Sequence, residues 1–206
     1  MSMISLNNIT KQFGKHVVLQ DLSLEFEANN MYAITGVSGC GKSTLLNIIG
    51  KLDKPTQGEV LYHQKPIKNV RNYLRSEIGY LFQNYALIEE QNVEKNLKIA
   101  LAYQKNKEKS ISQVLETVGL SGYEKQMIYE LSGGEQQRVA LARILLKPCN
   151  VVLADEPTGN LDEKNRDEVI EILKGMKKEG KCVIIATHDP FVANACDHII
   201  TLEKHK

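Results

Sequence analysis

The sequence lacks an excess of charge of either sign, because 26 Lys and Arg residues stand against 25 Asp and Glu residues, a net charge of +1. A chain that binds nucleic acid usually carries a basic excess or a basic stripe, so we expect no nucleic-acid partner. No apolar run approaches the roughly 18 residues that span a bilayer, and we expect no direct insertion into a membrane.

The chain is also poor in cysteine, and the cysteines it has are scattered. Cys40, Cys149, Cys182 and Cys196 form no C-x-x-C pair, which argues against a zinc site and is typical of reduced thiols. The N-terminus lacks the basic and apolar regions of a signal peptide. Together these absences predict a cytoplasmic protein.

The composition that is present suits one domain of 206 residues with a substantial core, since 42% of the residues are hydrophobic and 25% are charged. Short apolar runs alternate with amphipathic segments, which favours an α/β fold with a mostly parallel sheet and helices on both faces. We predict strands at residues 4–13, 17–27, 31–35, 59–62, 78–82, 151–154, 183–186 and 199–202, and helices at 42–50, 70–75, 134–146 and 162–178.

One region departs from this alternation. From about residue 84, strand-like runs disappear, and apolar residues such as Leu97, Leu101, Val114 and Val118 recur at helical spacings. We therefore predict a helical subdomain inserted at about residues 84–147 within a single domain that spans residues 1–206.

A glycine-rich run follows the predicted strand at 31–35 and matches the whole pattern G-x-x-x-x-G-K-[ST] between a strand and a helix. Its residues are Gly36, Val37, Ser38, Gly39, Cys40, Gly41, Lys42, Ser43 and Thr44. Glycines let backbone N–H groups turn inward around a phosphate, and the helix N-terminus adds the positive end of its dipole. We predict that Lys42 neutralises the phosphates of ATP and that Ser43 offers its hydroxyl to Mg²⁺.

The plainer alternative is a glycine-rich turn that merely begins a helix. Within the motif, Val37 and Cys40 occupy free positions. We interpret Cys40 as a small residue that donates its backbone N–H rather than as a redox switch, because no base besides Lys42 is close in sequence.

Two carboxylates, Asp155 and Glu156, end the apolar run at residues 151–154. A buried strand delivers Asp155 to the floor of the phosphate site, where it can bind Mg²⁺ directly or through water. Glu156 points elsewhere and can act as the base for the attacking water. The alternative is a solvated acidic turn before Pro157.

The run from Leu131 to Ala140, which contains Leu-Ser-Gly-Gly-Glu-Gln, resembles the signature of ABC (ATP-binding cassette) ATPases. Ser132, Gly133 and Gly134 stand at a predicted helix N-terminus and can face a phosphate. In that family this second cradle serves ATP bound on the partner chain, so the resemblance implies a homodimer that sandwiches ATP. Ser132 can also cap its own helix in a capping box with Glu135, and we expect both.

The resemblance covers essentially the whole chain and implies further site residues. Phe13 resembles the aromatic residue that stacks on adenine, although a Phe on a strand also suits a core. Gln83 resembles the Q-loop glutamine that reaches Mg²⁺ and the water, and His188 the switch histidine that contacts the γ-phosphate. The run from Asn160 to Asp162 resembles the D-loop, which crosses to the partner, and Asp162 is also predicted to cap the helix that follows.

The resemblance further implies the fold and the function. The expected fold is the P-loop ABC ATPase fold, with a mostly parallel core sheet, an N-terminal antiparallel β portion and the inserted helical subdomain. The run from Leu153 to Asp162 looks like the branch of lipoprotein-releasing, macrolide-export, bacteriocin-export and cell-division ATPases. We expect an ATPase that couples hydrolysis to a separate integral-membrane permease and lies on the inner face of the cell membrane through that permease.

Two alternatives remain. A cell-division type ATPase would signal through a membrane partner instead of moving cargo, and the sequence barely separates it from a transporter subunit. A soluble ABC ATPase that acts on DNA or ribosomes is less favoured, because such proteins usually carry coiled-coil insertions or two cassettes. For the permease contact, we expect Tyr85, Leu87 and Ile88 to line a groove for a short helix; the alternative is that Leu87 and Ile88 pack into the core of the helical subdomain.

Overall fold

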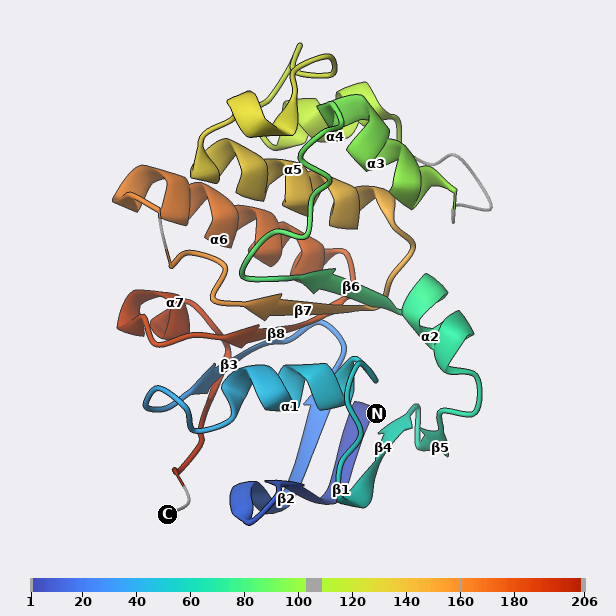
Figure 1. Cartoon of the computed structure of the whole chain (residues 1–206), viewed down its shortest axis with the longest axis vertical. Helices are drawn as coiled ribbons and strands as arrows, with labels where there is room; N and C mark the ends of the chain where they lie inside the picture. Colours follow the sequence, from blue (N-terminus) through green and yellow to red (C-terminus); the bar gives the residue numbers. More distant parts are fainter. Residues whose placement is uncertain (1, 103–108, 160, 205–206) are drawn as a thin grey trace.

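The fold contains two β-sheets with helices between and above them (Figure 1). The computed structural model describes residues 2–102, 109–159 and 161–204. The strands are β1 (Ser2–Phe13), β2 (His16–Glu27), β3 (Met31–Thr35), β4 (Gln57–Tyr62), β5 (Lys65–Pro66), β6 (Ile78–Leu81), β7 (Val151–Asp155), β8 (Cys182–Ala186) and β9 (His198–Thr201). The helices are α1 (Lys42–Ile49), α2 (Val70–Ser76), α3 (Val93–Leu101), α4 (Ile111–Thr117), the 3-10 helix η1 (Ile128–Glu130), α5 (Gly133–Leu146), α6 (Glu163–Lys178) and α7 (Pro190–Asn194).

The larger sheet has the strand order β6-β7-β8-β3-β9, and every pairing in it is parallel. Its central strands β7 and β8 are buried along their whole length, as their unbroken apolar sequences predict. The smaller sheet has the order β2-β1-β4-β5 and is antiparallel. The predicted combination of a parallel core sheet and an N-terminal antiparallel portion is therefore confirmed.

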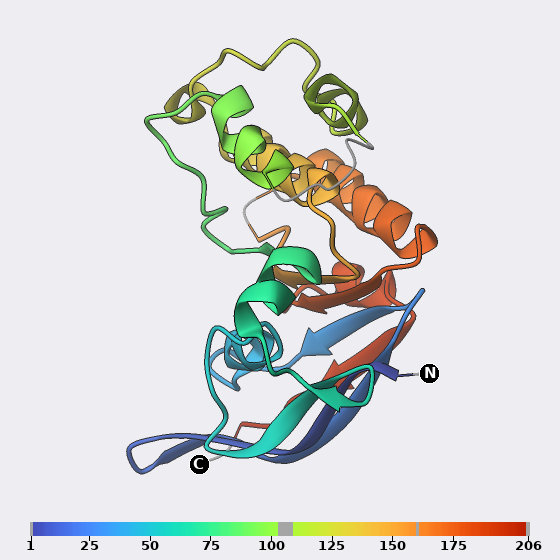
Figure 2. The same ribbon diagram turned by 90° about the vertical axis from the view of Figure 1, so that its right-hand side faces the viewer.

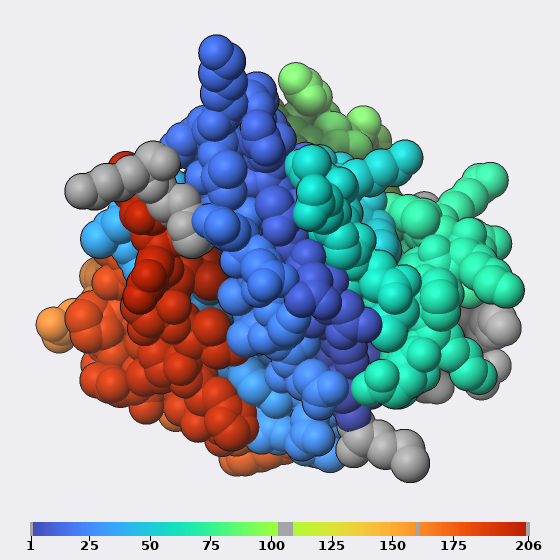
Figure 3. Space-filling model, turned by 90° about the horizontal axis from the view of Figure 1, so that it is seen from below, coloured from blue at the N-terminus to red at the C-terminus, as the bar shows by residue number. Residues whose placement is uncertain are grey.

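Helix α1 lies between the two sheets in Figure 1 and connects them through its packing. Its apolar residues Leu45, Leu46, Ile48 and Ile49 are fully buried in one core cluster with side chains from both sheets. Seen from below, the N-terminal residues lie between residues near position 60 and the C-terminal segment (Figure 3). The helix that begins at the glycine-rich run is thus held from both sides.

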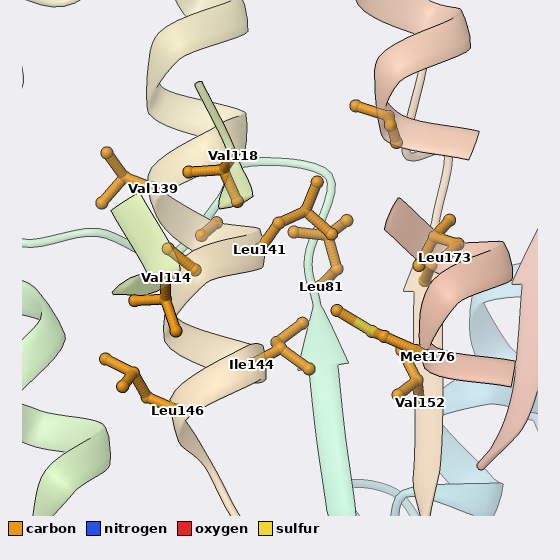
Figure 4. Packing of buried hydrophobic residues seen from close by; sticks show 14 of the residues in the cluster. Leu81, Val114, Val118, Val139, Leu141, Ile144, Leu146, Val152, Leu173 and Met176 are labelled. Atoms are coloured by element: carbon orange, nitrogen blue, oxygen red, sulfur yellow. The ribbon is translucent and has the colours of Figure 1, made fainter. Parts of the chain in front are cut away.

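A second core cluster fills the other face of the parallel sheet. Leu81 and Val152 of the sheet meet Ile144 of α5 and Met176 of α6 there (Figure 4). Figures 1 and 2 both place α3 and α4 at the end of the molecule opposite the antiparallel sheet. The division of the chain at about residues 84–147 into an inserted subdomain stays a prediction.

Most differences from the predicted elements are confined to their ends, but α7 and the two-residue strand β5 were not predicted. Helix α7 has Pro190 in its first turn, and Asp189 caps it by accepting a hydrogen bond from the N–H of Phe191 at 2.8 Å. Its five residues are too few for a periodic apolar pattern. In the described part of the chain, no helix is long and apolar enough to cross a membrane.

Candidate nucleotide-binding site

The glycine-rich run from Gly36 to Thr44 connects β3 to α1 and depends on glycine at two points. Gly36 has φ +141°, and a Cβ there would lie 2.6 Å from the carbonyl oxygen of Leu202. Gly41, with φ +101°, stands at the N-cap of α1, and a Cβ there would lie 2.8 Å from a methyl group of Val18. No L side chain fits either position, so the loop can close tightly around the N-terminus of α1.

Lys42 and Ser43 begin α1 and make the first polar contacts of the site. The Lys42 ammonium donates to the carbonyl oxygens of Gly36 at 2.9 Å and Val37 at 3.5 Å, so the cation lies against its own loop. The Ser43 hydroxyl donates to Asp155 Oδ1 at 3.0 Å. This contact joins α1 to the end of β7, 112 residues later in the chain.

Ser43 and Asp155 fit a Mg²⁺ ion, because a hydroxyl and a carboxylate are hard oxygen donors and lie within hydrogen-bond distance of each other. Burial raises the pKa of Asp155, since it removes water from the carboxylate; the Ser43 hydrogen bond and the Lys42 charge oppose this rise. A nearby divalent cation would favour the charged form of such a carboxylate.

Glu156 adopts φ +48°, a left-handed conformation that is uncommon for a non-glycine residue. Its backbone N–H donates to the Ala186 carbonyl at 2.9 Å, which holds it at the end of β8. Its carboxylate lies 2.9 Å from Nδ1 of His188. The side chain of Glu156 is 14% exposed and that of His188 is 70% exposed, so the pair lies at the mouth of the site.

A cleft of about 610 Å³ brings these groups together. It is lined by Val18, Ser38, Gly39, Gly41, Lys42, Ser43, Thr44, Gln83, Glu156, Gly159 and His188. Sequence reasoning missed Val18 and Gly159. The signal for Val18 was its place in β2, but which strand faces the loop depends on how the two sheets stack, and that is a tertiary property.

The signature residues lie elsewhere, because Ser132, Gly133 and Gly134 are not among the residues that line this cleft. Ser132 caps α5, and the Glu135 carboxylate accepts hydrogen bonds from the N–H of Ser132 at 2.8 Å and from its hydroxyl at 2.7 Å. The predicted capping box is therefore confirmed. The three residues form a second helix N-terminus that lies outside the cleft lined by the glycine-rich loop.

The remaining candidate residues occupy varied positions. Phe13 is 53% exposed at the end of β1, with the Lys11 ammonium 4.6 Å from its ring centroid, so it does not belong to the core. Cys40 is buried in the core cluster around α1, whereas Val37 is exposed. Asp162 caps α6, as predicted, by accepting a hydrogen bond from the N–H of Asn165 at 2.9 Å. Asn160 lies outside the described residues.

The segment after Gln83 packs partly against the core. Tyr85 and Leu87 are partly buried and pack against the core cluster that contains residues of α3, α4 and α5, and their contact with a permease stays a prediction. Ile88 is 45% exposed and lies outside the nearby groove. That groove, of about 300 Å³ and mostly apolar, lies against β6. It is lined by Leu52, Leu74, Ile78, Tyr80, Phe82, Ala86, Ile99, Ala100, Arg143, Ile144 and Lys147.

The fold and the site define a nucleotide-binding protein of the P-loop class, in which a strand, a glycine-rich loop and a helix form the phosphate cradle. The ABC transporter model matches residues 19–159, and the chain belongs to this family. It is an ABC-type ATPase, which converts ATP and water to ADP and phosphate.

Relatives in bacteria have similar sequences. The chain is 37% identical to the macrolide export ATP-binding/permease protein MacB of Salmonella typhimurium; the match covers all of this chain and 34% of that protein. It is 39% identical to the uncharacterized ABC transporter ATP-binding protein YvrO of Bacillus subtilis, over 96% of this chain and 92% of YvrO. It is 41% identical to the spermidine/putrescine import ATP-binding protein PotA of Acetivibrio thermocellus, over 91% of this chain and 54% of PotA.

Solved structures of ABC cassettes have the same fold. The dimeric cassette MJ0796 superposes with a TM-score of 0.88 at 35% identity, covering 97% of this chain and 94% of that one. A post-hydrolysis state of MJ0796 bound to ADP and phosphate gives the same TM-score at 33% identity, covering 98% of this chain and 94% of that one.

Proposed function

We propose that this ATPase is the energy-coupling subunit of an exporter. Two copies sandwich two molecules of MgATP, and hydrolysis drives a separate integral-membrane permease, to which the subunit binds on the inner face of the membrane. The substrate class would be a peptide, a lipid-linked molecule or a drug-like compound. The observation that carries this proposal is the separation of the catalytic cleft from the signature helix N-terminus within one chain.

The side chains of the cleft divide the work of hydrolysis. Lys42 moves from its loop carbonyls to the β- and γ-phosphates, while the N–H groups at the start of α1 bind the same anion. Ser43 and Asp155 would hold Mg²⁺, with Gln83 at the cleft wall, and the ion would supply positive charge beside the phosphates. Glu156 takes a proton from the attacking water, and His188, held at Nδ1 by Glu156, is free to contact the γ-phosphate through Nε2.

The signature residues require a second chain in this proposal. Ser132 and the backbone of Gly133 and Gly134 form an anion-binding helix N-terminus that lies outside the chain's own cleft. A two-fold axis that places this N-terminus opposite the cleft of a partner would complete two equal sites. The dimeric structure of MJ0796 supports this arrangement. In the proposed dimer, residues 84–147 of each chain form the inserted subdomain that carries the signature.

The permease would bind in the mostly apolar groove beside β6. Leu52, Phe82 and Ile99 provide apolar anchors, and Arg143 and Lys147 bring positive charge to the same groove. A short amphipathic helix of the permease would fit this chemistry, because its apolar face could contact these anchors. The name of MacB, an ATP-binding/permease protein, supports a permease partner.

The export direction rests on the relatives. Proteins named for macrolide export match this chain along 98 to 100% of its length, and an import ATPase matches 91% of it.

A cell-division type role would use the same ATPase and the same groove. Transport of substrate by reconstituted vesicles separates the two, because a signalling complex hydrolyses ATP without moving cargo.

The variant Glu156→Gln tests the catalytic part of the proposal. The amide keeps the size of the side chain but cannot accept the proton, so we expect turnover at least about 100-fold slower. The variant should still bind MgATP and accumulate as an ATP-bound dimer on size-exclusion chromatography. Near-normal hydrolysis would show that Glu156 is not the base, and a monomer at saturating ATP would contradict the sandwich.

The variant Ile99→Glu tests the groove. It places a charged group where the permease helix would need an apolar contact, so we expect weaker co-purification with the permease by at least about tenfold. ATP binding by the free subunit should not change. The matched control is Ile199→Glu, which changes a similarly exposed isoleucine on β9 outside the groove. Equal loss of the permease with both variants would contradict the assignment.

A further inference from the structure

The backbone just after Gln83 is held by an arginine from a distant helix. Arg143 of α5 donates from Nη1 to the Ala86 carbonyl at 2.6 Å and from Nη2 to the Tyr85 carbonyl at 2.8 Å. The planar guanidinium suits two neighbouring acceptors, because its N–H groups point in fixed parallel directions. These two contacts cross 57 and 58 residues of sequence.

The two residues that Arg143 holds are both strained. Tyr85 has φ +61° and Ala86 has φ +49°, so consecutive non-glycine residues adopt the left-handed conformation. Local hydrogen bonds support the turn, from the Tyr85 N–H to Phe82 O and from the Ala86 N–H to Asn84 O. Such a conformation persists only where the surroundings hold it in place. Arg143 supplies that restraint at the two carbonyls.

This restrained turn lies next to the catalytic cleft on one side and the apolar groove on the other. Gln83, two residues before Tyr85, lines the cleft, while Ala86 and Arg143 line the groove. Burial also disfavours the charged guanidinium and lowers the pKa of Arg143, so its two carbonyl contacts offset part of the lost hydration. Because Gln83 lies only two residues before Tyr85, a change in the backbone path at Tyr85 and Ala86 would displace Gln83.

We propose that Arg143 is a positioning residue for hydrolysis. By holding the carbonyls of Tyr85 and Ala86, it fixes the left-handed turn and so keeps Gln83 at the cleft wall. Arg143 is not among the residues that line the catalytic cleft. Its effect passes through Gln83, and the inference therefore rests on the catalytic role proposed above for that residue.

A double-mutant cycle on the purified full chain tests this inference. Arg143→Met keeps an unbranched apolar stem and removes both donors, and we expect kcat to fall about 10- to 100-fold, because small misplacements of a reacting group have effects of this size. The KM for ATP should change far less, since the phosphate cradle is unaltered. In a Gln83→Ala background, Arg143→Met should change kcat by less than about twofold.

A rescue variant probes the strain directly. Glycine adopts the left-handed conformation without steric penalty, so Ala86→Gly should restore part of the kcat lost in Arg143→Met. Lys181→Met is the matched control, because Lys181 also donates to a backbone carbonyl, that of Cys149 at 3.0 Å, at a place outside the cleft and the groove. We expect this control to lower the melting temperature and to leave kcat unchanged.

Each result of the cycle decides one point. If Arg143→Met keeps the kcat of the parent chain, or loses the same factor in the Gln83→Ala background, the positioning role is wrong. If Gln83→Ala itself hydrolyses ATP normally, the role proposed for Gln83 fails. If Arg143→Met does not fold, Arg143→Lys replaces it in the same cycle. Lysine keeps the charge but loses the two-donor geometry. The proposal then requires that Arg143→Lys lowers kcat and that this fall disappears in the Gln83→Ala background.

Discussion

The N-termini of α1 and α5 are both suited to bind phosphate, but they differ in the side chains that lie around them. At α1, polar side chains from distant segments meet: Lys42 from the helix, Asp155 from β7 and His188 after β8. At α5, Ser132 and Glu135 satisfy each other through a local capping box. The first N-terminus brings together a cation, a carboxylate and a histidine, whereas the second is held by contacts within its own first turn.

In the proposed dimer, this difference would let a single chain be stable without being a complete enzyme. The capping box fixes the signature helix within one chain, so dimer formation would not need to order it. The catalytic groups at α1 converge through tertiary packing of both sheets and do not depend on a second chain. Substitutions at the N-terminus of α1 and at that of α5 should therefore have different consequences.

The largest expected effect comes from removing the cation at α1. Lys42→Ala should abolish detectable ATP hydrolysis and weaken ATP binding severely, because the β- and γ-phosphates lose their main positive charge. A coupled phosphate-release assay and nucleotide titration measure both effects. Normal turnover in this variant would contradict the phosphate cradle.

A mixture of two inactive variants tests whether the N-termini of α1 and α5 complete a site across two chains. Ser132→Arg blocks the signature surface and leaves the same chain's cleft intact. An equal mixture with Lys42→Ala contains mixed dimers in which one composite site is complete, so roughly a quarter of the parent activity should return if pairing is random and the sites act independently. Absence of any recovery would show that both N-termini serve the same chain or that the two sites cannot act alone.

The sequence alone predicted well those features that depend on local spacing. The glycine-rich run, the buried strand before Asp155 and the cap at Ser132 all follow from residues close together in the chain. The turn at Tyr85 and Ala86 could not be predicted, because neither residue type favours a left-handed backbone, and Arg143, which holds the turn, is 57 residues away. Without the turn, the sequence also could not show that Ala86, and not Tyr85, lines the groove.

A smaller effect is expected at Phe13, which belongs to neither helix N-terminus. Its exposed ring is available to stack on a base, and loss of such stacking typically weakens binding about tenfold. We expect Phe13→Ala to raise the KM for ATP by about this factor and to leave the melting temperature unchanged, whereas Phe13→Tyr should behave like the parent chain. A KM that is the same in all three proteins would exclude adenine stacking by this residue.

The smallest expected effect concerns the capping box itself. Hydrogen bonds from the N–H and hydroxyl of Ser132 stabilise the charged form of Glu135 and lower its pKa below the usual value of 4.5; the Tyr123 hydroxyl donates a further bond at 2.9 Å. A carboxylate with a lowered pKa contributes stability that is fully present above pH 4.5 and is lost as the pH falls through its value in the folded protein.

Glu135→Ala should therefore lower the free energy of unfolding by about 1 kcal/mol at neutral pH, the usual value of a helix cap. Glu135→Gln should have a smaller effect, because its amide oxygen can still accept a bond from the Ser132 N–H. Urea unfolding at neutral pH and at several values below pH 4.5 measures both variants against the parent chain. The difference between the parent and the Gln variant should shrink as the pH falls; a constant difference would mean that the charge on Glu135 does not stabilise the signature helix, and that this N-terminus is held by neutral hydrogen bonds alone.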